Sequence, residues 1–283
     1  MSRLDAAFSR LRAADERALV AYLMAGDPSL DATRALVVEA ARRGADVIEL
    51  GVPFSDPIAD GPVIQRAGQR ALAAGTSLAR VIESVTAIRA EVSVPLVMFT
   101  YYNPVLAFGL KAFASAAADV GMDAVLVPDL PPEEADPLRA ETDAAGIDIV
   151  HLVAPTTPPA RARMVTARSR GFVYVVSLTG VTGERQALPP DLGAQLKALR
   201  RITRKPLCVG FGISTAEQAA AVGRHADGVV VGSAIVRLIE HQGTSPSLVK
   251  DVGELIASLK QPLRAPSATS AKTSTESPST GRR

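Results

Sequence analysis

Two carboxylates near a predicted strand end are the residues of this sequence best suited to chemistry. Glu49 follows the apolar pair Val47-Ile48, and Asp60 lies alone in the loop beyond it. Gly51 and Pro53 end the strand, because glycine weakens strand pairing and proline cannot donate to the ladder. An acid at a strand end and a second in a proline-rich loop suit proton transfer. The alternative is that Glu49 ends the strand in solvent and Asp60 serves a turn.

Glycine pairs follow two apolar stretches near the end of the chain. Gly210-Phe211-Gly212 follows residues 206–209, and Gly232-Ser233 follows residues 229–231 and opens a helix. Backbone N–H groups at helix starts bind phosphate, and glycine lets the backbone approach it closely. A tight turn explains either pair alone, but the two together favour a phosphate site. The loop 177–185 is small, polar and glycine-rich, which is typical of a loop that closes over a site, although an ordinary surface loop can have this composition.

Composition limits the class of protein. The chain has 283 residues, of which 47% are hydrophobic, and a formal net charge of +2. Because both charge signs are mixed along the chain, a nucleic-acid footprint is not indicated. Because Cys208 is the single cysteine, a disulfide within the chain is excluded. The sequence shows no targeting signal, and it has no apolar run long enough to span a membrane. We therefore expect a cytoplasmic protein.

Eight apolar stretches alternate with helical patterns. The stretches are 18–24, 47–50, 95–100, 124–127, 149–153, 172–176, 206–209 and 229–231. Helical patterns include 62–91 and 104–119, and a further amphipathic helix is expected over residues 3–14. Continuous apolar strands separated by helices predict an α/β fold, a closed (β/α)8 TIM barrel in a single domain. An open doubly wound sheet is the alternative, but no G-x-G-x-x-G follows the first strand. We assign the barrel to residues 1–262 and expect the Ser/Thr/Pro-rich residues 263–283 to form a disordered tail.

Strand parity places the candidate acid. Active sites of such barrels lie at the C-terminal ends of the strands, and side chains alternate along each strand. If Ile48 and Leu50 point outward to the helices, then Glu49 points into the barrel mouth. The same parity turns Tyr174 inward, and we expect Tyr22 to point inward too. Because no group of His, Cys and carboxylate residues has metal-ligand spacing, we predict no metal site.

These motifs resemble one known family. Residues 49–62 are similar to the signature of the tryptophan synthase alpha chain family. Gly26-Asp27-Pro28, residues 101–104, residues 127–131, residues 177–183 and the two glycine pairs follow in the family's order. The resemblance covers roughly residues 4–260. It implies a lyase that cleaves indole-3-glycerol phosphate to indole and glyceraldehyde 3-phosphate by a retro-aldol reaction, with no cofactor or metal in this chain.

The resemblance also implies roles for single residues. Glu49 would be the general acid and base at indole C3 and at the glycerol hydroxyl, and Asp60 would accept a hydrogen bond from the indole N–H. The implied substrate-binding residues, which wall the indole, hold the phosphate or close the site, are Tyr22, Phe99, Leu126, Leu152, Tyr174, Thr182, Gly183, Phe211, Gly212, Gly232 and Ser233. Tyr22 departs from the family pattern, in which phenylalanine is common, and Leu178 stands where some members carry arginine.

A partner is implied as well. Members of the family form an alpha2beta2 heterotetramer with a beta chain that holds pyridoxal phosphate and receives indole through a tunnel. The implied interface residues here are Asp56, Tyr102, Asn103 and Pro104. Three alternatives stay open at this point: another phosphosugar barrel such as an isomerase, a stand-alone indole-releasing lyase, and a non-catalytic activator of the beta chain.

Overall fold

The computed structural model describes residues 1–176, 191–210 and 212–265, and it contains a closed barrel of eight parallel strands in chain order. The strands are β1 (Ala18–Met24), β2 (Val47–Gly51), β3 (Leu96–Phe99), β4 (Ala124–Leu126), β5 (Asp148–Val153), β6 (Val173–Val176), β7 (Leu207–Gly210) and β8 (Gly228–Val231). The last strand pairs with the first, with Ala18 opposite Gly228, so the sheet has no open edge. The predicted TIM barrel is confirmed.

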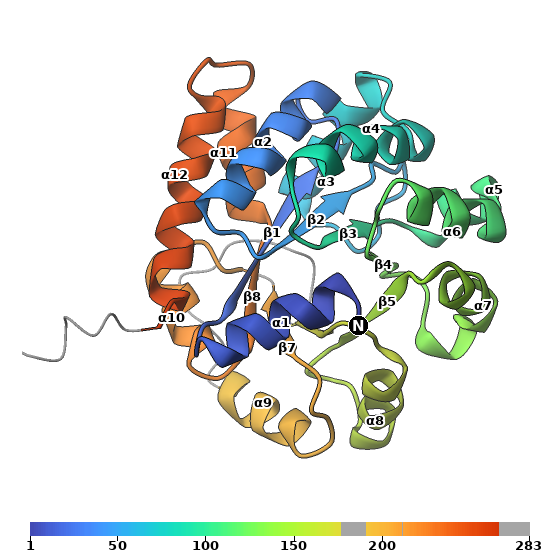
Figure 1. The fold of residues 1–283 in the computed structure, drawn as a ribbon, viewed down its shortest axis with the longest axis vertical. Helices are drawn as coiled ribbons and strands as arrows, with labels where there is room; N and C mark the ends of the chain where they lie inside the picture. Colours follow the sequence, from blue (N-terminus) through green and yellow to red (C-terminus); the bar gives the residue numbers. More distant parts are fainter. Residues whose placement is uncertain (177–190, 211, 266–283) are drawn as a thin grey trace, which may run out of the picture.

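Helices surround this barrel (Figure 1). They are α1 (Arg3–Ala13), α2 (Leu30–Arg43), α3 (Pro62–Ala73), α4 (Leu78–Glu91), α5 (Tyr102–Phe108), α6 (Leu110–Asp119), α7 (Asp136–Ala145), α8 (Pro159–Arg168), α9 (Leu192–Arg200), α10 (Ala216–Gly223), α11 (Ser233–Gln242) and α12 (Leu248–Lys260), with short 3-10 turns η1 (Pro132–Glu134) and η2 (Gln261–Leu263). Among the described residues no single helix is long and apolar enough to span a membrane. Helices α3 and α4 together have the length and apolar composition of a span, but the chain bends by 92° between them.

The core has two layers, as alternation along the strands requires. Ala18, Val20 and Val47 belong to the cluster that fills the barrel interior. Ile48 and Leu50 belong to the cluster between the strands and the helices. Since Ile48 and Leu50 face outward, the side chain of Glu49 faces the interior, as the parity of β2 predicted.

Helix α1 covers the end of the barrel at which the strands begin. Leu4, Phe8 and Leu11 pack against the interior cluster, and the rings of Phe8 and Phe172 lie 5.8 Å apart. Ser2 caps this helix, and Asp5 completes a capping box. The apolar face predicted over residues 3–14 therefore closes the lower end of the barrel, opposite the mouth.

Aspartates bind the neighbouring strand at this lower end. The Oδ2 atoms of Asp46, Asp123 and Asp227 accept hydrogen bonds from the backbone N–H groups of Leu19, Leu96 and Leu207, at 2.9, 2.8 and 2.7 Å. Each aspartate precedes one strand and holds the first residues of a strand beside it. These side chains therefore fix the register between strands.

Two predicted helices are each divided in the structure. The pattern over 62–91 forms α3 and α4, because Gly75 adopts φ +77° and the Ser77 side chain caps the second helix. The pattern over 104–119 forms α5 and α6, with a break at Gly109. Packing continues through Leu263, which is buried and whose carbonyl accepts from the Arg17 N–H at 2.8 Å, one residue beyond the boundary predicted for the barrel. The tail predicted beyond it lies, from residue 266, outside the described residues.

Candidate active site

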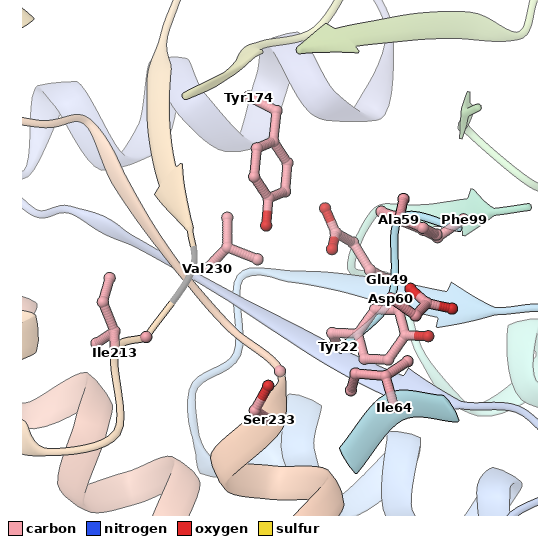
Figure 2. Close-up of a pocket in the computed structure, with 12 residues that line it drawn as sticks. Tyr22, Glu49, Ala59, Asp60, Ile64, Phe99, Tyr174, Ile213, Val230 and Ser233 are labelled. Atoms are coloured by element: carbon pink, nitrogen blue, oxygen red, sulfur yellow. The ribbon is translucent and has the colours of Figure 1, made fainter. Parts of the chain in front are cut away.

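A pocket opens at the C-terminal ends of the strands, where the fold predicts an active site (Figure 2). Strands β1, β2, β3, β6 and β8 contribute to it, together with the loop after β2 and the segments after β7 and β8. Its lining residues are Tyr22, Glu49, Ala59, Asp60, Ile64, Phe99, Tyr174, Gly212, Ile213, Val230, Gly232 and Ser233. Eight of the residues that the sequence assigned to the site thus meet in one pocket.

Glu49 is the acid at the floor of this pocket. It lies on β2, pairs in register with Tyr22 of β1 and Val97 of β3, and is 1% exposed. Its Oε1 atom has no hydrogen-bond partner within the described part of the chain. Burial raises the pKa of Glu49 from its ordinary value of 4.5 to about 8. At neutral pH the carboxyl is therefore protonated and can donate a proton.

Asp60 lines the same pocket beside Glu49, at the end of the loop that leads into α3 (Figure 2). The Gln65 side chain donates to its carbonyl at 2.9 Å, and its own N–H donates to the Pro57 carbonyl at 3.1 Å. Burial raises the pKa of Asp60 from 3.8 to about 6, while a hydrogen bond with the Tyr101 hydroxyl acts in the opposite direction. Asp60 is thus mostly ionised at neutral pH, whereas Glu49 is not.

Aromatic rings frame the two acids. Tyr22 and Phe99 meet edge to face with ring centroids 5.6 Å apart. Figure 2 shows the Tyr174 hydroxyl pointing toward the Glu49 carboxyl from β6. Burial, with the nearby carboxyl groups, raises the pKa of Tyr22 and of Tyr174 well above the ordinary value. Both hydroxyls stay protonated, so the pocket offers flat apolar walls with hydroxyl donors at their edges.

The opposite side of the pocket is made of backbone at helix starts. Gly212 and Ile213 lie just before α10, and Gly232 and Ser233 begin α11. The first turn of α11 contains no acidic side chain. Because the N–H groups of a first turn lack partners within the helix and carry positive dipole charge, this side is suited to an anion.

The other predicted substrate-binding residues do not line the pocket as described. Leu126 is fully buried in the interior cluster and Leu152 packs against it. Thr182, Gly183 and Phe211 lie outside the described residues. Sequence reasoning gave no role to Tyr101, which contacts Asp60. The signal available was its position directly after a predicted strand, where polar side chains reach the mouth of such a barrel.

The predicted partner segments lie next to each other. The rings of Phe54, in the Asp56 loop, and Tyr101, directly before α5, have centroids 5.3 Å apart. Asp56 and Asn103 are exposed, whereas Tyr102 and Pro104 are half-buried. Two large apolar side chains beside these positions are also exposed, Ile58 at 75% and Leu106 at 49%.

Comparison with known proteins gives one consistent answer. A sequence model described as "Tryptophan synthase alpha chain" matches residues 8–264. The tryptophan synthase alpha chain of Geobacter sp. (strain M21) is 49% identical over 262 residues, which is 92% of this chain and 97% of the relative. That of Carboxydothermus hydrogenoformans is 45% identical over 264 residues, 93% of this chain and 99% of the relative.

Solved structures agree with the sequence comparisons. Tryptophan synthase subunit alpha from Legionella pneumophila superposes with a TM-score of 0.86 at 38% identity, covering 93% of this chain and 98% of that one. A chain of Mycobacterium tuberculosis tryptophan synthase gives a TM-score of 0.87 at 35% identity, covering 94% of this chain and 99% of that one. Matches of this identity over nearly the whole length of both chains show that the protein belongs to the tryptophan synthase alpha chain family.

Proposed function

We propose that this chain cleaves indole-3-glycerol phosphate to indole and glyceraldehyde 3-phosphate, the alpha half-reaction of tryptophan biosynthesis. The observation that carries the proposal is the pairing of Glu49 and Asp60 in one pocket. Burial holds the pKa of the first near 8 and that of the second near 6, so one is an acid and the other an anion at neutral pH. Family membership supports the same reaction.

In the proposed reaction Glu49 moves both protons. The protonated carboxyl donates to indole C3 and leaves a cationic indolenine. The resulting carboxylate then removes the proton of the hydroxyl on the carbon attached to C3. The aldehyde carbonyl forms, the carbon–carbon bond breaks, and its electron pair returns to the ring as indole. This step regenerates the protonated carboxyl, so no net proton is consumed.

Asp60 and the pocket walls hold the substrate in this proposal. The ionised Asp60 accepts a hydrogen bond from the indole N–H and stabilises the positive charge that forms on the ring. Tyr22, Phe99 and Tyr174 contact the faces and edges of the heterocycle. The phosphate lies against the N–H groups of Gly232 and Ser233, at the start of α11.

We further propose that the indole passes to a tryptophan synthase beta chain, which would hold pyridoxal phosphate in an alpha2beta2 assembly. The exposed Ile58 and Leu106 support an interface over the Asp56 loop and α5, because large exposed apolar side chains are typical of a contact surface. No cofactor of this chain enters the proposed cleavage.

The test is indole release. Purified chain is incubated with indole-3-glycerol phosphate, alone and with a beta chain, and we expect indole in both, with faster turnover in the complex. Glu49→Gln should abolish cleavage while native mass spectrometry still shows binding to the beta chain. Absence of indole in both conditions would contradict the proposal, and equal rates with and without the beta chain would indicate a stand-alone lyase.

A further inference from the structure

Tyr101 connects the loop that carries Asp60 to the end of β3. Its hydroxyl accepts a hydrogen bond from the Ala59 N–H at 3.0 Å and makes a hydrogen bond with the Asp60 carboxylate. Its ring packs against Phe54 at 5.3 Å, and the residue is 2% exposed. One side chain therefore contacts the loop near its start, at Phe54, and at its end, at Ala59 and Asp60.

The backbone on either side of Tyr101 is fixed to β4 and to the loop that follows it. The Thr100 N–H donates to the Leu126 carbonyl at 3.0 Å. The Tyr102 N–H donates to both carboxylate oxygens of Asp129, at 2.9 and 3.2 Å. These bonds tie the backbone of Tyr101 to the barrel, so its side chain holds the Asp60 loop from a base outside that loop.

We infer that Tyr101 is a positioning residue for the alpha half-reaction, whose hydroxyl holds the Asp60 carboxylate at the pocket in the orientation that receives the indole N–H. The inference rests on the proposed function, because it concerns how the chain prepares that contact. Tyr101 itself does not line the pocket. It acts through Asp60, by favouring its ionised form and by keeping the loop end in place.

The groups that face Asp60 come from several strands. Tyr22 of β1 and Glu49 of β2 line the same pocket as Asp60, Tyr101 follows β3 and hydrogen-bonds the Asp60 carboxylate, and Asp129 follows β4 and acts on Tyr101. Among the causes acting on Asp60, burial raises its pKa and the Tyr101 hydrogen bond lowers it. Removing the hydroxyl should therefore raise the pKa of Asp60.

The kinetic test uses Tyr101→Phe, which deletes one oxygen and keeps the ring. We expect kcat/KM for indole-3-glycerol phosphate to fall roughly 10- to 100-fold, the range for a lost hydrogen bond to a charged group. The acidic limb of the kcat/KM profile should move to higher pH. In an Asp60→Asn background the same substitution should cause little further loss, because the two residues act as one unit.

Phe54→Leu is the matched control, because it removes the ring contact and leaves the hydroxyl in place. It should leave the acidic limb at its wild-type pH even if kcat/KM falls. The inference is overturned if the acidic limb of Tyr101→Phe stays at its wild-type pH. It is also overturned if the fold-losses in kcat/KM of Tyr101→Phe and Asp60→Asn multiply in the double variant.

A direct measurement separates this inference from the proposed function. Titration of the Asp60 carboxyl ¹³C signal, without substrate, should give a higher pKa in Tyr101→Phe than in wild type. If wild type releases no indole, the proposed function fails while this titration still decides the role of Tyr101. If the variant does not fold, the Asp60 carboxyl ¹³C signal of the wild-type protein is compared in H₂O and in D₂O. A hydrogen bond from the Tyr101 hydroxyl should make the position of this signal differ between the two solvents. An unchanged signal refutes the inference.

Discussion

Glu49 should destabilise the folded protein, and increasingly so as the pH rises. The folded state holds the pKa of Glu49 at about 8, above the ordinary value of 4.5 that we assign to the unfolded chain. The folded state therefore keeps a proton that the unfolded state loses between these two values. The stability associated with that proton is complete below about pH 4.5 and is lost as the pH rises through about 8.

The magnitude follows from the two pKa values. Each pKa unit corresponds to about 1.4 kcal/mol, so the cost of burying Glu49 is about 1 kcal/mol near pH 5 and about 4 kcal/mol near pH 8. These figures are upper bounds, because relaxation around the charge recovers part of the cost. Glu49→Gln retains the shape of the protonated carboxyl and cannot ionise. The variant should thus be inactive in cleavage and more stable than wild type.

Differential scanning calorimetry at pH 5 and at pH 8 measures this effect. With about 2–4 °C in midpoint per kcal/mol for a chain near this size, the midpoint of Glu49→Gln should exceed that of wild type by about 3 °C near pH 5 and on the order of 10 °C near pH 8. The exposed Glu83→Gln is the matched control and should show little change at either pH. An equal gain at both pH values, or no gain, would show that Glu49 is not buried as described.

Three further outcomes follow from the pocket. The kcat/KM profile for indole-3-glycerol phosphate should be bell-shaped, rising through the pKa of Asp60 at about 6 and falling through that of Glu49 at about 8, and a flat profile over this range would contradict the assigned roles. Gly210→Ala should reduce thermal stability and activity, because its new Cβ would lie 2.1 Å from the Tyr174 hydroxyl oxygen and 2.5 Å from the ring carbon that bears it. Tyr174→Ala removes both atoms, so Gly210→Ala should lower the midpoint less in that background, and an equal loss in both backgrounds would exclude this clash. Ser233→Asp should raise KM about 10-fold or more by placing a carboxylate at the proposed phosphate position, whereas Ser233→Ala should have a smaller effect, and similar KM values would place the phosphate elsewhere.

Strand parity made much of the site predictable. Once Ile48 and Leu50 were assigned to the outer layer, alternation turned Glu49 inward, and the same rule oriented Tyr174. Such a rule is reliable here because a closed parallel barrel has two apolar layers and a one-residue error would reverse every side chain.

What sequence did not predict depends on contacts between distant residues. The hydrogen bond between Tyr101 and Asp60 joins two loops that no periodic pattern relates. The same holds for Asp46 and Asp123, whose side chains each bind the backbone of a residue 27 positions earlier in the chain. The division at Gly75 was visible as a Gly-Thr-Ser run, but the apolar period continued across it and hid the break.

The aspartates at the start of β2, β4 and β8 suggest how such a protein can be engineered. They fix the alignment of the strands from the end where α1 closes the barrel, whereas every pocket-lining residue belongs to the other end. Replacing the loops at the mouth should therefore leave the assembly of the strands largely undisturbed. A library of variants that differ only in the loops at the C-terminal ends of the strands could be screened for activity on new substrates, with a small loss in the yield of folded protein.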